Sequence, residues 1–427
     1  MSVPRLAAVA AEVDVAIVGA GAAGIAAARR CLAEGLTCAV VEARDRVGGR
    51  CVTVPIDGQP IDLGAHWLHA GSMNPLVTLG RQRGEAMAEA RFASRLIVDG
   101  AIADDAIARE HAEAFGRASD AIVAAREADA DVSIAEILPD LGRWRVPITM
   151  TLTLISGRPL EEVSAQDFPS EEFGDNWLVD GGYGAYLARL AADLPIALGR
   201  PVERIDWSGS GVAIEGEGGC LRARAAIVTV PVAVLASGSI GFTPRLPDRA
   251  SEAIAAFLPG TYEHILLDWP DSPFEARDRF AKIVAPEASY GLASRLGGSA
   301  LHYLEIDHVT AEARGRDGRA LAAFAKEWLA SQLGADVVRR LRTRHVTGWI
   351  GEPFSREAWA VARPGRAGDR KTLSEPIGER IWLAGEASSV RLWGTVGGAW
   401  EEGDAAAAAI ARRLGLRSGQ QPVQKSA

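Results

Sequence analysis

Cysteine, long apolar runs and basic clusters are all scarce in this chain. Its 427 residues contain only four cysteines and no C-x-x-C pair, which excludes a disulfide framework and a zinc knuckle. Sparse, unpaired thiols are typical of a reducing compartment, so the sequence predicts a cytoplasmic protein. No stretch approaches the roughly 18 consecutive apolar residues that cross a bilayer, so no membrane span is predicted.

Charge and motif content exclude two further classes of protein. The chain has 46 Lys and Arg against 55 Asp and Glu, which gives a formal net charge of −9. The sequence contains no long run of consecutive Lys and Arg residues. The positive surface that phosphate-backbone binding requires is missing, so no nucleic-acid partner is expected. The sequence also lacks a G-x-S-x-G turn, which removes the main support for hydrolase chemistry.

Length and composition indicate a large folded protein. Hydrophobic residues make up 48% and charged residues 24% of the chain, which is enough apolar material for two domains or one composite domain of interleaved segments. Residues 1–12 carry only a weak Ala/Val run, and we interpret them as a leader without a targeting role. Residues 419–427 are polar and aperiodic, which predicts a loose tail.

The first ordered segment predicts a dinucleotide-binding unit. The order is a strand Val13–Val18, the turn Gly19-Ala-Gly21-Ala-Ala-Gly24, an Ala-rich helix to Leu36, and a second strand Thr37–Val41 that ends at Glu42. Gly19 allows the tight turn, Gly21 lets a pyrophosphate approach the backbone, and Gly24 lets the helix pack on the strand. The helix N-terminus offers N–H groups to the phosphates, and Glu42 can accept hydrogen bonds from the ribose hydroxyls.

The residues after Glu42 favour FAD over a nicotinamide cofactor. They contain a second glycine loop, Arg44-Asp-Arg46-Val-Gly48-Gly49-Arg50, and then Asp62-Leu-Gly64-Ala-His66-Trp67. A nicotinamide domain would ordinarily continue with further βα units. A basic, glycine-containing loop soon after Glu42 suits a larger cofactor, because its pyrophosphate and ribityl chain must be contacted by more of the protein.

Further motifs extend along almost the whole chain. They are Asp180-Gly-Gly-Tyr183, Gly199-Arg-Pro-Val202-Glu-Arg-Ile205, Ala226-Ile-Val-Thr-Val-Pro231, Arg380-Ile-Trp-Leu-Ala-Gly385-Glu386 and Gly394-Thr395-Val396-Gly-Gly-Ala-Trp400. In this order, and after the glycine fingerprint, they resemble the flavin amine oxidase family, which includes monoamine oxidases, polyamine oxidases and the histone lysine demethylase. The run from Asp62 to His69, with Asn74-Pro75, looks most similar to the polyamine oxidase branch.

The resemblance implies an α/β fold in which two domains are interleaved. A Rossmann-like FAD-binding domain, a parallel sheet with helices, is expected from residues 12–75, 178–252 and 352–418. An α+β substrate domain is expected from 76–177 and 253–351. The sequence itself agrees, because the stretch from Met73 to Asp140 has helical periodicity with few strand runs, while 260–309 carries strand-like runs such as Tyr262–Trp269.

The motifs also imply which residues bind FAD. They are Gly19, Gly21, Ala22, Ala23, Gly24, Glu42, Ala43, Arg44, Gly49, Arg50, Gly64, Ala65, His66, Trp67, Val202, Gly385, Glu386, Thr395 and Val396. In monoamine oxidases a cysteine before the first pocket aromatic bonds covalently to the flavin. Ala358 matches that position and has no nucleophile, so FAD is expected to be non-covalent.

Catalytic positions are carried over in the same way. Two pocket positions face the flavin in the family, and these fall on Trp359 and Thr395, so only half of the usual aromatic pair is present. His69 matches a histidine of the polyamine oxidase branch that faces the substrate channel, although an ordinary buried histidine is an equal alternative. The strand lysine near flavin N5 is replaced by His264, or by Glu263 if the register slips by one residue.

Other polar residues are not assigned to the site. His302 and His308 are expected on one strand face with apolar residues between them, and no metal site is predicted. Four acidic residues could recognise a distal ammonium, but they are more typical of a solvated surface; they are Glu89, Glu171, Glu172 and Asp175.

The predicted function is FAD-dependent oxidation of a small amine. Hydride would leave the carbon beside the amine nitrogen for flavin N5, the imine would be hydrolysed, and molecular oxygen would yield hydrogen peroxide. Polyamines or other secondary amines are the expected substrates. A dehydrogenase or desaturase with a non-oxygen acceptor is one alternative, and a flavoprotein interaction module without turnover is another. The sequence leaves the particular amine and the oligomeric state open.

Overall fold

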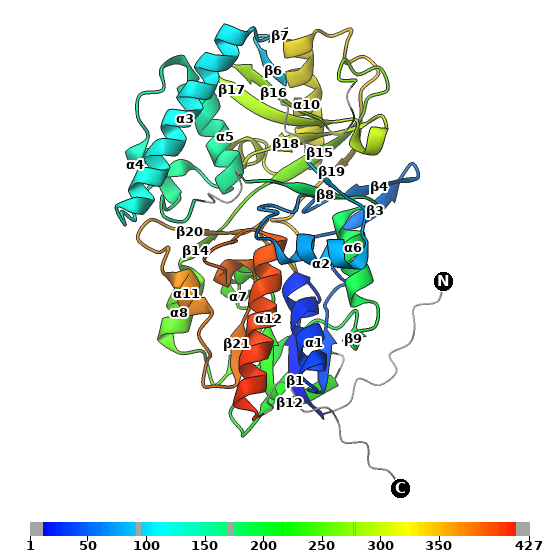
Figure 1. Cartoon of the computed structure of the whole chain (residues 1–427), viewed down its shortest axis with the longest axis vertical. Helices are drawn as coiled ribbons and strands as arrows, with labels where there is room; N and C mark the ends of the chain where they lie inside the picture. The colour runs from blue at the N-terminus through cyan, green and yellow to red at the C-terminus, as the bar shows by residue number, and fades with distance from the viewer. Residues whose placement is uncertain are drawn as a thin grey trace.

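The computed structural model describes residues 12–90, 95–168, 174–217, 219–275, 277 and 279–415. The described chain has two lobes, each built on one large sheet (Figure 1). The lower lobe in Figure 1 carries the N-terminal strand and the last helix, and the upper lobe carries the middle of the chain. The predicted α/β fold is confirmed, whereas the residue boundaries of the two domains stay a prediction.

Parallel strands form the centre of the eight-stranded sheet in the lower lobe. Strand β1 (Glu12–Val18) lies between β2 (Cys38–Val41) and β12 (Gly219–Val228), and β9 (Ile196–Ala197) and β21 (Ile381–Leu383) are added in parallel. The sheet is completed by β10 (Arg204–Asp206), β11 (Val212–Gly216) and β13 (Gly241–Thr243). The central strands are almost wholly apolar because both of their faces are covered.

Two Ala-rich helices cover one face of this sheet. They are α1 (Ala22–Ala33) and α12 (Val396–Arg413), which lie side by side in Figure 1. A Cβ at Gly403 would lie 2.0 Å from the carbonyl oxygen of Ala23, so the two helices approach closely at that glycine. Helix α1 ends earlier than the sequence predicts, because Gly35 takes a left-handed φ of 77° and the chain turns there towards β2.

The upper lobe is built on a seven-stranded, mainly antiparallel sheet. Its order is β19 (Arg342–Val346), β15 (Glu263–Asp268), β18 (Leu301–Ile306), β17 (Ala288–Ser294), β16 (Arg279–Ala285), β6 (Arg95–Val98) and β7 (Ala101–Ile102). Helices α3 (Asp105–Glu127), α4 (Ile134–Ile137), α5 (Arg145–Ser156), α9 (His308–Ala313) and α10 (Gly318–Leu333) complete this lobe. The predicted helical stretch after Met73 therefore also contributes strands β6 and β7, and β6 joins the sheet parallel to β16.

Smaller elements connect the two lobes. The short strand pairs are β3 (Thr53–Ile56) with β4 (Gln59–Asp62), β5 (Met87–Glu89) with β8 (Trp177–Val179), and β14 (Phe257–Pro259) with β20 (Ala360–Ala362). The remaining helices are α2 (Pro75–Arg83), α6 (Tyr183–Ala191), α7 (Val232–Ala236), α8 (Asp248–Ala255) and α11 (Asp369–Leu373). Short 3-10 turns lie at Gly142–Trp144, Leu160–Glu162, Leu296–Gly298 and Glu386–Ser388.

The prediction that His302 and His308 lie on the same face of one strand is wrong. His302 lies on β18 with its ring 5.7 Å from that of Trp269. His308 lies beyond the strand as the first residue of α9, and its Nδ1 is 2.9 Å from the Thr261 hydroxyl. The strand stops because Asp307 caps the helix by accepting the Thr310 N–H at 3.1 Å.

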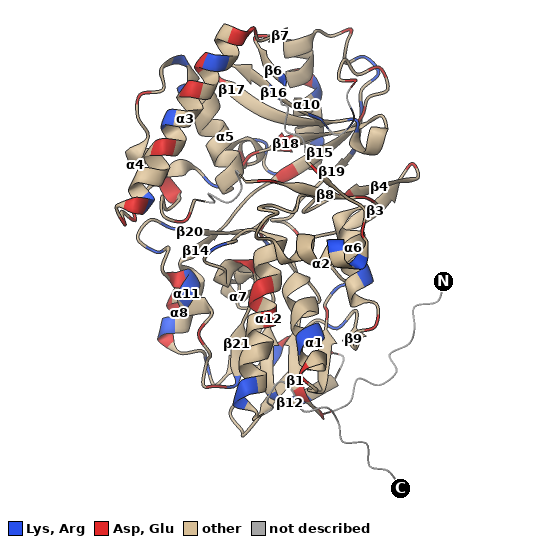
Figure 2. Cartoon of the chain, in the orientation of Figure 1, with Lys and Arg blue, Asp and Glu red and all other residues tan. Residues whose placement is uncertain are grey.

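Surface charge and helix hydropathy can be read over the same described ranges. In Figure 2 residues of both signs are interspersed along α3, α8 and α11. Within the described part of the chain, no helix combines the length and the apolar character needed to cross a membrane. The predicted tail at 419–427 and the leader up to residue 11 lie outside the described residues.

A buried ion pair joins the segment before residue 169 to helix α11. The Arg370 and Asp167 side chains are only 1% and 4% exposed. The Arg370 guanidinium donates to Asp167 Oδ2 at 2.6 Å and to the Ala360 carbonyl at 2.8 Å. Asp167 Oδ2 also accepts the Ala362 N–H at 3.1 Å, so both members of the pair bond to the backbone of strand β20.

We predict that Arg370→Met lowers the free energy of unfolding by about 3–5 kcal/mol, because Asp167 is left buried without its partner. Arg366→Met is the matched control, since its ion pair with Asp369 lies nearer the surface and exposed pairs contribute about 1 kcal/mol or less. Denaturant unfolding of both variants measures the difference. Equal losses in the two variants would contradict the prediction.

Candidate active site

A cavity of about 720 Å³ is lined by residues of both lobes. It reaches from the glycine turn after β1 to the inner strands of the upper sheet. Every residue predicted to bind the cofactor or to act in catalysis lies on its wall except Gly24. The tertiary structure thus brings together side chains from most of the chain, while the role of each residue stays a prediction.

The two glycine turns at one end of the cavity touch each other. Gly19 has a φ of 103°, and a Cβ there would lie 2.6 Å from the Thr229 hydroxyl. A Cβ at Gly49 would lie 3.3 Å from Gly21 Cα, so side chains at these turns would fill the space where backbone is exposed. Gly24 has a packing role, because its Cβ would lie 1.9 Å from the Gly19 carbonyl oxygen. This arrangement fits a pyrophosphate held by backbone N–H groups.

Glu42 directly follows β2, where an acidic residue that binds the ribose hydroxyls is expected. Its side chain is buried, and its two oxygens accept the Ala20 N–H at 2.7 Å and the Arg44 N–H at 2.9 Å. These bonds fix the carboxylate and leave lone pairs for hydroxyl donors. The Glu42 carbonyl accepts the Arg200 N–H at 2.8 Å, which brings the connection between β9 and β10 alongside. Val202 lies in that connection and not in a strand.

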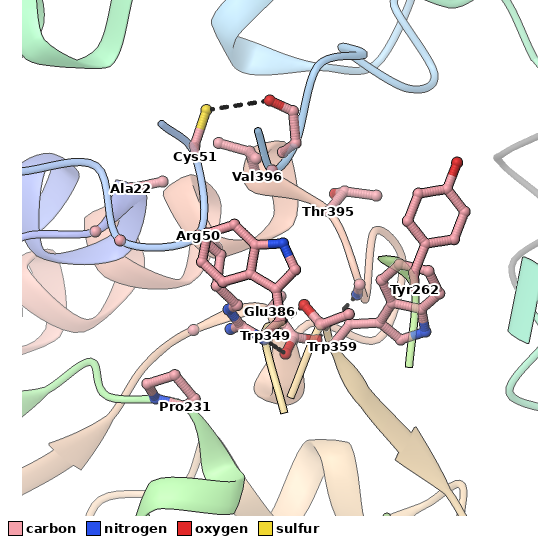
Figure 3. Close-up of a pocket in the computed structure, with 18 of the residues that line it drawn as sticks. Ala22, Arg50, Cys51, Pro231, Tyr262, Trp349, Trp359, Glu386, Thr395 and Val396 are labelled. Carbon is pink, nitrogen blue, oxygen red and sulfur yellow. Dashed lines mark hydrogen bonds and ion pairs between the residues drawn. The ribbon is translucent and has the colours of Figure 1, made fainter. Parts of the chain in front are cut away.

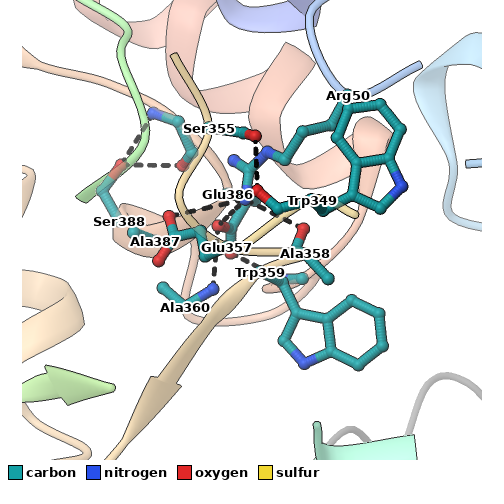
Figure 4. Close-up of polar contacts among 12 residues, drawn as sticks. Arg50, Trp349, Ser355, Glu357, Ala358, Trp359, Ala360, Glu386, Ala387 and Ser388 are labelled. Carbon is teal, nitrogen blue, oxygen red and sulfur yellow. Dashed lines mark hydrogen bonds and ion pairs between the residues drawn. The ribbon is translucent and has the colours of Figure 1, made fainter. Parts of the chain in front are cut away.

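A charged cluster at the cavity wall fixes Arg50 (Figure 4). The Arg50 guanidinium donates to Glu386 Oε1 at 3.0 Å and to the Ala358 carbonyl at 3.0 Å, and it lies 3.5 Å from Glu357. Burial raises the pKa of Glu357, and the Glu386 charge raises it further against the opposing effect of Arg50. The cluster therefore favours one ionised carboxylate paired with Arg50 and one protonated neighbour.

The opposite end of the cavity is aromatic (Figure 3). Trp359 donates its indole N–H to the Ser156 carbonyl at 3.0 Å, and its ring centroid is 5.4 Å from that of Tyr262. Thr395 stands at the N-cap of α12, where its hydroxyl accepts the Gly398 N–H at 3.0 Å. The capping role gives a structural reason for a threonine at this position. Tyr262, which the sequence analysis did not select, supplies the second aromatic ring instead.

His264 lies on the cavity wall, whereas Glu263 points to the other side of β15. Glu263 Oε1 accepts the Trp349 N–H at 2.9 Å. The His264 ring is 4.6 Å from Tyr303 and 5.1 Å from His66. Burial lowers the pKa of His264 well below its usual range, and His66 adds to that effect. The imidazole is consequently neutral at pH 7.

His66 and His69 are also neutral side chains of the wall. Burial lowers the pKa of each to about 4. His69 Nδ1 lies 2.9 Å from Asn176 Oδ1, and the His69 carbonyl accepts a bond from Asn74 at 2.8 Å. These contacts orient the ring, and the low pKa makes His69 a weaker proton acceptor than a free histidine.

Two charged residues on the wall were missed from the sequence. Lys282 and Glu305 lie in apolar strands, Arg279–Ala285 and Leu301–Ile306, and both line the cavity, Glu305 buried and Lys282 half-buried. A lone charge at an inward position of an apolar strand is the signal that could have found them. Of the four acidic residues left unassigned, Asp175 accepts the Trp177 indole N–H at 3.1 Å and Glu89 is exposed on β5. Glu171 and Glu172 lie outside the described residues.

Comparison with known proteins settles the family. The family of flavin containing amine oxidoreductases matches residues 22–94 and 139–411 of this chain. The chain belongs to this family. The resemblance inferred from the sequence is thereby confirmed, and the predicted cofactor, non-covalent FAD, agrees with a family that contains flavin. Ala358 on the cavity wall is consistent with that mode of binding.

Several relatives of this flavin amine oxidoreductase are histone demethylases. It is 28% identical over 438 residues to lysine-specific histone demethylase 2 of Homo sapiens, covering 93% of this chain and 53% of that protein. It is 28% identical over 454 residues to lysine-specific histone demethylase 1 homolog 1 of Arabidopsis thaliana, covering 96% of this chain and 54% of that one. The chain thus spans about half the length of these curated relatives.

A solved structure of putrescine oxidase shares the fold. The TM-score is 0.77 at 22% identity, with 94% of this chain and 99% of the other covered, in the wild type bound to putrescine. The agreement over nearly the full length of both chains supports the two-lobed arrangement of this amine oxidoreductase.

We predict that Glu386→Ala weakens FAD binding by about tenfold or more, because Arg50 loses its charged partner and two backbone N–H donors lose their acceptor. Glu401→Ala is the matched control, since Glu401 pairs with Arg391 at the surface of the same region. Titration of the apoprotein with FAD, followed by flavin fluorescence, measures the affinity. An unchanged dissociation constant for Glu386→Ala would show that the cluster does not support the cofactor.

Proposed function

We propose that this enzyme oxidises a small secondary amine or polyamine and releases hydrogen peroxide. The observation that carries the proposal is the aromatic end of the cavity, where Trp359 and Tyr262 lie side by side. FAD, when bound, accepts the hydride from the carbon beside the amine nitrogen. The proposal is also supported by the relationship to demethylases, which remove alkyl groups from an amine nitrogen.

The apolar surroundings favour the reactive form of the substrate. A nitrogen lone pair must be free for the carbon to lose hydride, and desolvation favours the neutral amine over the ammonium. Trp359 and Tyr262 would orient the chain of the substrate, because each ring is itself held by a hydrogen bond, to Ser156 and to Glu305. Thr395 leaves the facing side open, which would admit a bulkier substituent on the nitrogen. His69 would contact the substrate from the opposite wall.

A second candidate function is an amine dehydrogenase with a non-oxygen acceptor. It is favoured by His264, because this neutral imidazole occupies the position matched to a lysine in the family. A positive charge there would stabilise the negative charge that develops on oxygen as it is reduced. Both candidate functions share the amine half of the reaction and differ only in the acceptor. A cytoplasmic location stays a prediction in either case.

The first test separates amine oxidation from its alternatives. Anaerobic addition of secondary amines to the holoenzyme should bleach the flavin absorbance, and admitting air should yield one hydrogen peroxide for each amine consumed. Trp359→Ala should slow bleaching by roughly 10–100-fold through lost orientation, with FAD content unchanged, whereas Trp359→Phe should retain most of the rate. Absence of bleaching by every amine would refute the proposal. Bleaching without peroxide would establish the second candidate.

A second prediction concerns oxygen. Since burial holds the pKa of His264 well below its usual range, the imidazole gains charge only in strongly acidic solution. The rate constant for reoxidation by oxygen should therefore stay flat from pH 8 down to about 6.5 and rise only below that. His264→Lys should raise it by about tenfold at pH 7 while changing flavin reduction by less than about threefold.

Stopped-flow measurement of the two half-reactions checks this prediction. His345→Lys is the matched control, because His345 lies exposed on the neighbouring strand β19. Fast, pH-independent reoxidation that His264→Ala leaves unaltered would show that the position has no influence on oxygen.

A further inference from the structure

A row of polar positions crosses the cavity face of the upper sheet. His264 on β15 pairs with Glu305 on β18, and Gly291 on β17 pairs with Lys282 on β16. A Cβ at Gly291 would lie 2.1 Å from Glu305 Oε2, so the Glu305 side chain lies directly over that glycine. All four residues line the cavity. Because Gly291 has no side chain, Glu305 and Lys282 face a shared space from two sides.

Glu305 occupies the part of this row nearer the aromatic end. It is 3% exposed, and its Oε1 accepts a hydrogen bond from the Tyr262 hydroxyl. Tyr262 in turn contacts Trp359 and His264 through its ring. Burial raises the pKa of Glu305 to about 7, with Tyr262 and Lys282 opposing the shift. The Glu305 carboxylate is therefore positioned for an ammonium or amine N–H close to the aromatic rings.

Lys282 occupies the far part of the row. Its Nζ donates to the Thr151 hydroxyl at 3.2 Å and lies 5.5 Å from the centroid of the Phe115 ring. An ammonium carries three N–H donors, and Thr151 accepts one of them. Burial lowers the pKa of Lys282 to about 8, an effect that Glu305 opposes. At pH 7 the group is mainly charged, and Lys282 lines the cavity.

These two residues determine the charge of the substrate half of the cavity. Among the described wall residues from 76–177 and 253–351, Lys282 and Glu305 are the ones with Lys, Arg, Asp or Glu side chains. At pH 7 Lys282 is mainly charged, whereas Glu305, with a pKa of about 7, is only partly ionised. This wall therefore carries no net negative charge that would attract a polycation. A chain with ammonium groups at both ends would bring one of them towards Lys282, and in a low-dielectric site such like-charge contacts are costly.

We propose that Glu305 and Lys282 form a two-ended subsite that selects an amine whose far end is a carboxylate. The reacting nitrogen would lie between Glu305 and the aromatic rings, and the carboxylate would bind Lys282 with Thr151 beside it. The proposal rests on the proposed amine oxidation. It narrows the substrate class from secondary amines and polyamines to secondary amines that carry a carboxylate at the far end, and it leaves polyamines out. The contrary view is that Lys282 and Glu305 only neutralise each other within the wall.

Three secondary amines of matched length distinguish these views. N-methylbutylamine has an apolar end, N-methylputrescine a second ammonium, and N-methyl-γ-aminobutyrate a carboxylate. The readouts are the dissociation constant and the limiting rate of anaerobic flavin bleaching in the holoenzyme. Calorimetric binding of valerate, which has no amine to oxidise, gives an independent readout of the carboxylate end.

We expect the wild type to bind N-methyl-γ-aminobutyrate at least tenfold more tightly than N-methylputrescine, because one partner of Lys282 is an anion and the other a cation. Lys282→Met should remove that preference and weaken valerate binding by about 10–100-fold. Glu305→Gln should weaken all three amines to a similar degree and leave valerate binding within about threefold. Lys326→Met is the matched control, since Lys326 is exposed on α10, and it should change nothing.

The outcomes separate the subsite from the proposed function. If the wild type bleaches with the amines but prefers N-methylputrescine, or if Lys282→Met keeps the wild-type order, the subsite is refuted and amine oxidation stands. If no amine bleaches the flavin while valerate binds in a Lys282-dependent way, amine oxidation is refuted and the carboxylate site stands. If Lys282→Met does not fold, Lys282→Gln takes its place. The order in which the wild type binds the three amines still decides whether the subsite exists.

Discussion

The Glu386 carboxylate is the constraint on which the rest of the cavity depends. One of its oxygens accepts bonds from Arg50 and from the Ala360 N–H, both at 3.0 Å, and the other accepts the Gly394 N–H at 3.1 Å. These donors come from the second glycine loop, from strand β20 and from the turn before α12. A single buried anion thus holds three distant parts of the chain in register. Donors to a buried charge are the stronger class of hydrogen bond.

The arrangement of the two sheets follows from where that clamp holds the chain. Parallel strands β1, β2 and β12 direct their carboxyl ends towards the glycine turns, the usual place for a dinucleotide in an open sheet. The upper sheet covers the other end of the cavity with one polar row on an otherwise apolar face. The predicted cofactor half combines backbone groups of the glycine turns with a few side chains such as Glu42 and Glu386, and the proposed substrate half has side chains of its own. Recognition of the amine can change through those side chains without altering the cofactor half.

Burial gives the substrate half its chemical character. The three histidines of the wall are all shifted towards the neutral imidazole, whereas Glu305 and Lys282 are shifted towards neutrality without reaching it at pH 7. A wall of this kind disfavours isolated charge and tolerates charge that is paired. The same property favours a neutral amine at the reacting position, as the proposed chemistry requires.

The sequence by itself determined the family, and it predicted FAD and most of the residues that line the cavity beside the glycine turns. The glycine turns, Glu42 and the closing motif with Glu386 are local patterns whose spacing is set by backbone geometry, so they can be recognised without a structure. The match of His264 to the strand lysine of the family is likewise read from a short motif and stays a prediction. Helix and strand limits differed by a few residues because capping groups decide them.

Only the tertiary structure decided which side chains of the upper sheet line the cavity. Lys282 and Glu305 lie on strands β16 and β18, which β17 separates in the sheet, and Tyr262 directly precedes β15. No spacing along the chain predicts that Gly291 leaves room between Lys282 and Glu305. The tertiary structure also showed that Thr395 caps a helix, because capping depends on where α12 begins. A motif that depends on backbone geometry is formed by residues close together in the sequence, so it can be recognised there. A cavity wall is formed by residues far apart in the sequence, and it exists only when their strands lie side by side.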